Sequence, residues 1–142
     1  MDTDKEIEMI LKDISVTDVK SFDDIKQANQ LAIDTAYSEY LKYDINKENK
    51  KKVELFIHNG YEYIELTNST PTGWVCYIDT SKFYNIKIHM SGLFLKFKSN
   101  NTVILKLNNR YYNVNIHKKI FFRKISNKDI LKIHLIEAIK NN

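Results

Sequence analysis

Hydrophobic positions follow one period in the first part of the chain and another in the rest. Up to about residue 43, apolar residues recur every three or four positions, as they do along one face of a helix. From Val53 onward they alternate with polar residues, as in strands that bury one side. The pattern predicts helices over about 4–14 and 22–43, a solvated connection at 44–52, and extended structure from residue 53.

Three predicted helices begin with a capping box, in which a hydroxyl side chain is followed three residues later by an acid. The boxes are Thr3 to Glu6, Ser21 to Asp24 and Ser126 to Asp129. The last one predicts a C-terminal helix over 126–142. Apolar residues lie almost all around this helix, a pattern typical of burial on more than one side.

Turn residues divide the extended region into seven or eight short strands. Asn-Gly between two alternating runs is a strong signal for a tight hairpin, because both central residues need positive φ. The turns are predicted at Asn59-Gly60, Ser91-Gly92, Ser99-Asn100-Asn101 and Asn108-Asn109. Because the connections are short, strands that follow one another in the chain should be neighbours in the sheet.

These elements predict an α+β fold in a single domain over residues 1–142. It consists of two N-terminal helices, a curved antiparallel meander of seven or eight strands, and one C-terminal helix. The meander forms either a sheet or a partly open barrel. Its parts are an acidic helical part at 1–52, the antiparallel sheet at 53–125, and the last helix at 126–142.

Charge is distributed very unevenly over the 142 residues. The formal net charge is +4, but residues 1–80 carry −7 and residues 81–142 carry +11. No Asp or Glu occurs between Asp79 and Asp129, a stretch that holds nine Lys and two Arg. Such asymmetry indicates contact with a polyanion. Ile, Lys, Asn, Tyr and Phe make up 70 residues, which is typical of an AT-rich genome and also favours Lys.

Regular alternation of the strands would gather basic, aromatic and amide side chains on one face of the sheet. Lys neutralises phosphate, and aromatic and amide groups stack on bases or form hydrogen bonds with them. The candidate nucleic-acid-binding residues are Lys87, His89, Phe94, Lys96, Lys98, Lys106, Arg110, Tyr111, Asn113, Asn115 and His117. The alternative is a solvated face whose lysines suppress aggregation.

A second candidate surface would bind a protein. Tyr61 and Tyr63 share one face of a predicted strand, and tyrosines supply large contact area at small entropic cost. Ile133 and Ile136 lie on one apolar line of the last helix, which could meet a partner chain or a second copy. Packing within the core is the ordinary alternative for all four residues.

Motifs for catalysis, metals and cofactors are absent from the sequence. The four histidines lack metal-ligand spacing, and the three glycines are isolated, so neither a metal nor a phosphate loop is expected. With one Cys, no signal peptide and no apolar run of membrane-spanning length, the sequence predicts a cytoplasmic protein in a reducing compartment. We expect no cofactor and no membrane span.

The sequence therefore predicts a non-enzymatic accessory protein whose basic half binds nucleic acid or a nucleoprotein complex. The alternative is a small inhibitor or immunity protein, of the kind that phages and mobile elements encode, which binds a protein partner. A third possibility is a metal-independent ribonuclease with His89 or His117 as general base and Lys96 or Lys98 with Tyr111 on the phosphate.

Overall fold

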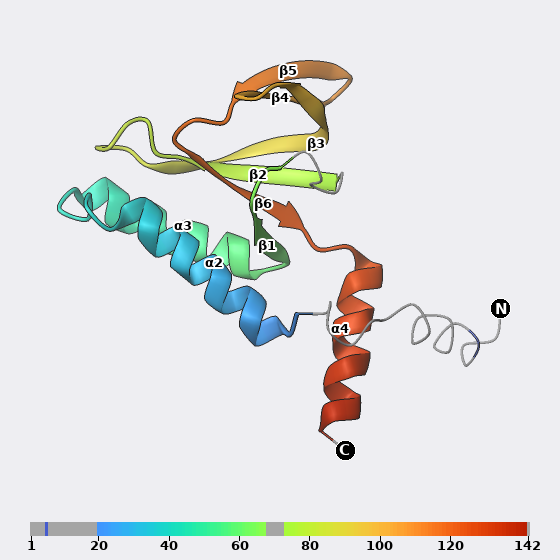
Figure 1. Ribbon diagram of the computed structural model, residues 1–142. Helices are drawn as coiled ribbons and strands as arrows, with labels where there is room; N and C mark the ends of the chain where they lie inside the picture. Colours follow the sequence, from blue (N-terminus) through green and yellow to red (C-terminus); the bar gives the residue numbers. More distant parts are fainter. Residues whose placement is uncertain (1–4, 6–19, 68–72, 142) are drawn as a thin grey trace. The chain divides into compact units, whose positions relative to one another are not determined.

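The computed structural model describes residue 5 and residues 20–67 and 73–141 (Figure 1). The described helices are α2 (Phe22–Tyr37), α3 (Asp44–His58) and α4 (Asn127–Lys140). The described strands are β1 (Tyr61–Ile64), β2 (Gly73–Asp79), β3 (Lys87–Ser99), β4 (Thr102–Leu107), β5 (Arg110–Asn115) and β6 (Lys119–Lys124). The predicted helix over 4–14 and its capping box lie outside the described residues, apart from Lys5.

The predicted α+β class with an antiparallel sheet is confirmed. The six described strands form one sheet in the order β1-β6-β2-β3-β4-β5, and every neighbouring pair is antiparallel. The sheet is open, with β1 and β5 as its edges. Sequential strands are neighbours from β2 to β5, as predicted. The expectation fails for β1 and β2 and for β5 and β6, because β6 returns to a place between β1 and β2.

The predictions for residues 44–58 are wrong, because the connection at 44–52 and the strand at 53–58 together form α3. Val53 and Ile57 are four residues apart and buried, while Leu55 between them is 77% exposed. This is helical burial, although the same three positions also fit the alternation of a strand. Asn59-Gly60 consequently joins a helix to β1 and does not close a hairpin.

The predicted turn at Ser91-Gly92 is also wrong, because β3 runs through it without interruption. The pairing of β3 with β2 shifts register at this point, which is the signature of a β-bulge. A Cβ added to Gly92 would lie 2.5 Å from the carbonyl oxygen of Lys106, so β4 approaches here too closely for any side chain. Gly92 therefore serves close strand packing and not chain reversal.

The chain divides into two compact units, residues 1–25 with 125–142 and residues 26–124. In the first unit, Ile25, Ile125 and Ile133 form a small buried cluster against Phe22 and Ile130. The two described capping boxes lie here, and the backbone N–H of Asp24 and of Asp129 donates to the predicted serine hydroxyl. The single domain over 1–142 stays a prediction.

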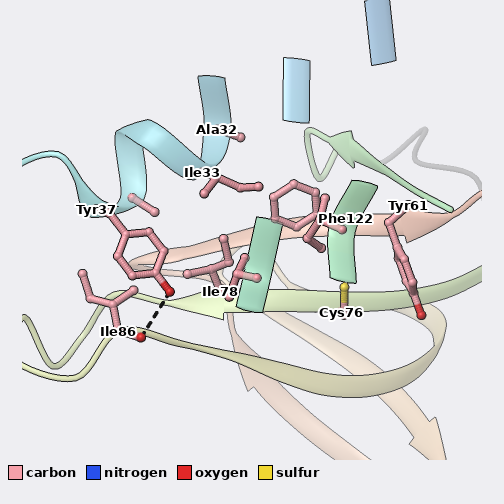
Figure 2. Packing of buried hydrophobic residues seen from close by; sticks show 11 residues of the cluster. Ala32, Ile33, Tyr37, Tyr61, Cys76, Ile78, Ile86 and Phe122 are labelled. Carbon is pink, nitrogen blue, oxygen red and sulfur yellow. Dashed lines mark hydrogen bonds between the residues drawn. The ribbon is translucent and has the colours of Figure 1, made fainter. Parts of the chain in front are cut away.

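In the second unit, α2 and α3 cover one face of the sheet, which we call the helix face (Figures 1 and 2). Ile33 and Tyr37 of α2 and Ile57 of α3 are buried together with Cys76, Ile78 and Phe122 of the sheet. The hydroxyl of Tyr37 donates to the carbonyl oxygen of Ile86 at 3.2 Å. Successive side chains of a strand point to opposite faces of the sheet. Cys76, Ile78 and the residues directly opposite them on neighbouring strands therefore point to the helix face, and we say that such residues have the parity of the helix face.

The opposite face, which we call the inner face, buries a second cluster without either of these helices. Val75, Phe94, Val103, Leu105 and Phe121 are all less than 5% exposed. A flat sheet would leave such residues open to water, so the strands must curve over them. The register shifts along β3 allow this curvature, because bulges bend a strand and increase its twist.

Two buried asparagines satisfy backbone groups that the sheet and helices leave unpaired. Asn29 donates to the carbonyl of Tyr61 at 2.8 Å and accepts from the N–H of Tyr63 at 2.7 Å, so it covers the outer edge of β1. Asn46 donates to the carbonyls of Tyr40 and Phe83 and accepts from the N–H of Ile86. Both side chains follow the rule that buried polar groups are hydrogen-bonded.

Candidate functional site

The predicted basic face is divided between the two faces of the sheet. Before the bulge at Ser91-Gly92, Lys87 lies opposite Asp79 and His89 opposite Tyr77, with the parity of the inner face. After a second register shift, between Phe94 and Lys96, Lys96 lies opposite Ile104, and Lys106 lies opposite Leu93, both with the parity of the helix face. An inserted residue reverses which side chains point to which face, and simple alternation cannot show this.

Four side chains form a continuous row across β2, β3, β4 and β5. Trp74 lies opposite Leu93, Leu93 opposite Lys106, and Lys106 opposite Tyr111. Trp74, Leu93 and Tyr111 are 36%, 39% and 66% exposed, so α2 and α3 do not cover this end of the helix face. The Lys106 ammonium lies 5.7 Å from the centre of the Tyr111 ring, within cation–π range.

A second row lies beside the first, where Lys96, Ile104 and Asn113 are opposite one another on β3, β4 and β5. Next to it Asn115 lies opposite Thr102. We call the combined surface the outer patch, and its members are Trp74, Leu93, Lys96, Ile104, Lys106, Tyr111 and Asn113. Lys96 and Lys106 take part in none of the ion pairs between described residues.

The structure thus brings together Lys96, Lys106, Tyr111, Asn113 and Asn115 from the predicted set. Phe94 was expected on the open face, and this expectation is wrong, because its side chain packs in the inner-face cluster, where it is 4% exposed. Lys98, Arg110 and His117 are exposed at strand ends or in a loop. Trp74 was missed, because a single Trp at a strand start is usually a core residue.

The predicted partner-binding residues are buried or half-buried. Tyr61 is buried with its ring 4.9 Å from that of Phe56, and Tyr63 is half-buried against Phe122. Burial raises the pKa of both phenols. In α4, Ile133 is buried in the first unit and Ile136 is half-buried. A role for these residues in binding a partner stays a prediction.

The basic residues of the acid-free segment lie on β3, β4, β5 and β6 and in the loops next to them, within residues 80–124. Because this segment contains no Asp or Glu, it is positive on both faces of the sheet. Arg123, at the far end of β6, instead pairs with Glu62 of β1. A cluster of like charges without counter-ions raises the local concentration of anions and speeds their association.

His58 lies in a polar network between α2 and α3. Its Nε2 is 2.9 Å from Oε1 of Gln30, whose amide group donates to both Asp34 and Glu54. The Gln30 oxygen must therefore accept from His58, so the neutral His58 carries its proton on Nε2. Nδ1 is buried and has no hydrogen-bond partner among the described residues. Burial, followed by the charge of Lys26, lowers the pKa of His58 against the opposing effect of Glu54.

We expect this histidine to make the fold less stable below pH 6.5. Because its pKa is lower in the folded than in the unfolded chain, the unfolded state binds more protons, so stability is lost as pH falls from 6.5 toward the folded pKa. Urea unfolding at pH 7.5 and at pH 5.5 measures the loss, which should be smaller in His58→Gln. Equal losses in both proteins would contradict the expectation.

Cys76 is the only cysteine, and it is fully buried on the helix face. Burial raises the pKa of its thiol to about 12. At pH 8 only about one thiol in ten thousand is then ionised, and the thiolate is the reactive form. We expect Ellman's reagent to react at least about 100-fold more slowly with the native protein than with protein unfolded in guanidinium chloride. A fast native reaction would show that Cys76 is accessible.

Within the described residues, no three His, Cys, Asp or Glu side chains gather in a way that could hold a metal ion. None of the helices in the described ranges is long and apolar enough to cross a membrane. When the chain was compared with known protein families, with curated proteins and with solved structures, no match was found.

Proposed function

We propose that this protein is a non-enzymatic accessory protein that binds single-stranded nucleic acid through the outer patch. The observation that carries the proposal is the row Trp74–Leu93–Lys106–Tyr111, in which exposed aromatic rings at the two ends flank a leucine and a lysine across four adjacent strands. Proteins that bind single strands combine such stacking platforms with cations that neutralise the backbone.

The dimensions of the row support this proposal. Neighbouring strands lie about 4.8 Å apart, so Trp74 on β2 and Tyr111 on β5 are separated by roughly 14 Å across the sheet. A single strand can therefore cross the patch with one base on each ring and its phosphates close to Lys96 and Lys106. Asn113 adds an amide that can form hydrogen bonds with base edges.

The surrounding charge supports the same class of ligand. Residues 80–124 contain no carboxylate to repel phosphates, and neither lysine of the patch is held by an ion pair with a described residue. Double-stranded nucleic acid fits less well, because its bases are already stacked on one another and present no free faces to Trp74 and Tyr111. We therefore expect single strands to bind more tightly than duplexes.

The test uses intrinsic fluorescence, because Trp74 is the only tryptophan in the chain and lies in the patch. Titration with short single-stranded RNA and DNA should quench this fluorescence saturably, and Tyr111→Ala should weaken binding about 5- to 150-fold, as expected for one stacked base. Tyr84→Ala, which removes an exposed tyrosine outside the patch, is the matched control.

Three results would contradict the proposal. One is the absence of quenching at low salt, and another is an equal effect of Tyr111→Ala and Tyr84→Ala. The third is tighter binding of duplexes than of single strands. In the first case the exposed Trp, Leu and Tyr would point to a protein partner, and pull-down experiments with Leu93→Asp would follow.

A further inference from the structure

A small cleft lies at the other end of the β2–β3 pair, beside the loop that joins these strands. Its volume is about 150 Å³. The residues that line it are Asp79, Ser81, Lys82, Asn85, Lys87 and His89. Lys87 and His89 belong to the predicted basic face but lie before the bulge, with the parity of the inner face. The cleft is therefore separate from the outer patch.

Hydrogen-bond donors outnumber acceptors in this cleft. Asp79 supplies the only carboxylate, and its Oδ1 already accepts from the N–H of Ser81 at 2.9 Å. Asn85 accepts through Oδ1 from the Asn49 side chain at 3.3 Å, which leaves the two amide hydrogens of Asn85 as donors. Lys82 and Lys87 add two ammonium groups that form no ion pair with a described residue.

The histidine of the cleft is held in place from two sides. Its ring stacks on Tyr77, with ring centres 5.1 Å apart and planes inclined by 21°. Its Nε2 lies 3.9 Å from Oδ2 of Asp79 on the neighbouring strand. Lys119 lies above the same Tyr77 ring at 6.0 Å and adds positive charge nearby.

The carboxylate of Asp79 is itself kept ionised. Burial opposes ionisation, but hydrogen bonds from Ser81 and the charges of Lys119 and His89 outweigh it, so the pKa of Asp79 lies below its usual value. Two ammonium groups, those of Lys82 and Lys87, line the cleft, and a third, that of Lys119, lies nearby, so cations outnumber the one carboxylate. This excess of positive charge suits an anion that carries two negative charges and several acceptor oxygens.

We propose that this cleft binds a phosphate group, as inorganic phosphate or as the terminal phosphate of a larger molecule. The volume admits a phosphate, and the donors around it match tetrahedral oxygens. Lys82 and Lys87 neutralise the charge, while Asn85, Ser81 and His89 donate hydrogen bonds. Asp79 positions the His89 ring beside the cleft. The proposal does not depend on nucleic-acid binding by the outer patch.

Proton NMR of the histidine rings tests the proposal in the intact protein. Titration with inorganic phosphate at pH 6.5 should move the His89 signal saturably, while the signals of the exposed His117 and His134 move little. Lys87→Gln should weaken phosphate binding about tenfold, because it removes one charge-assisted contact. Lys98→Gln is the matched control, since it neutralises an exposed lysine elsewhere on β3.

The two sources of phosphate are distinguished by a second titration. A 5′-phosphorylated oligonucleotide that moves the His89 signal at lower concentration than its unphosphorylated form indicates a terminal phosphate. A saturable shift with inorganic phosphate but with neither oligonucleotide indicates free phosphate. Parallel shifts of His89, His117 and His134, or equal affinities of Lys87→Gln and Lys98→Gln, would mean unspecific ion binding and would overturn the proposal. An unchanged His58 signal verifies that each variant is folded.

Discussion

Replacement of Asn46 by alanine should lower the free energy of unfolding by about 3 kcal/mol or more, because each buried polar group left without a partner costs about 1–3 kcal/mol. The side chain is fully buried, and its loss leaves the carbonyl of Phe83 and the N–H of Ile86 unpaired and the carbonyl of Tyr40 with only the 3.4 Å bond from the N–H of Tyr43. For a domain whose total stability is about 5–15 kcal/mol, this is a large fraction. Urea unfolding followed by circular dichroism measures it.

Two further variants show whether the hydrogen bonds are responsible. Asn46→Asp keeps an acceptor for Ile86 but replaces the donor to the two carbonyls, so it should be at least as destabilising as alanine. Lys51→Ala changes an exposed position on the same helix and should alter stability by less than about 0.5 kcal/mol. An Asn46→Asp protein as stable as the original would contradict the assigned hydrogen bonds.

Reversal of both patch charges, in Lys96→Glu with Lys106→Glu, should weaken nucleic-acid binding at least about 100-fold at low salt. The variant loses two phosphate contacts, and its new carboxylates repel the phosphates. Replacement of the same two lysines by Gln should instead reduce the slope of log affinity against log salt by about 1.4 for single strands, since each contact contributes about 0.7. Fluorescence anisotropy over a range of salt concentrations measures both effects.

The matched control reverses two lysines that lie outside the patch. Lys98→Glu with Lys118→Glu makes the same change in net charge within the same acid-free segment. We expect this double variant to bind at least about tenfold more tightly than the double variant of the patch. Equal losses in the two proteins would assign binding to the overall field of the segment and not to the outer patch.

Local signals predicted the elements that depend on local chemistry. Asn108 and Asn109 both have positive φ, as the predicted two-residue hairpin between β4 and β5 requires. Ser21 and Ser126 cap their helices as the sequence indicated. These features are decided by residues a few positions apart, so a pattern along the chain contains the necessary information.

Elements that depend on tertiary packing were not predicted correctly from the sequence. Val53, Leu55 and Ile57 fit a strand by their spacing, and only the core beneath α3 decides that Leu55 stays exposed. The bulge near Gly92 depends on the close approach of Lys106, a residue 14 positions later. A second register shift, between Phe94 and Lys96, places Lys96 on the face opposite to Lys87 and His89, and this too depends on pairing with β4.

The two edges of the sheet differ in whether another strand can be added to them. On β1, the side chain of Asn29 occupies the outward-facing groups of Tyr61 and Tyr63. β5 pairs regularly with β4 along its whole length and contains neither a proline nor a bulge. Extension of the sheet is therefore possible from β5 alone. If two copies paired through β5, the joined sheet would end in a blocked β1 at each side, so assembly would stop at a dimer and could not continue into a fibre.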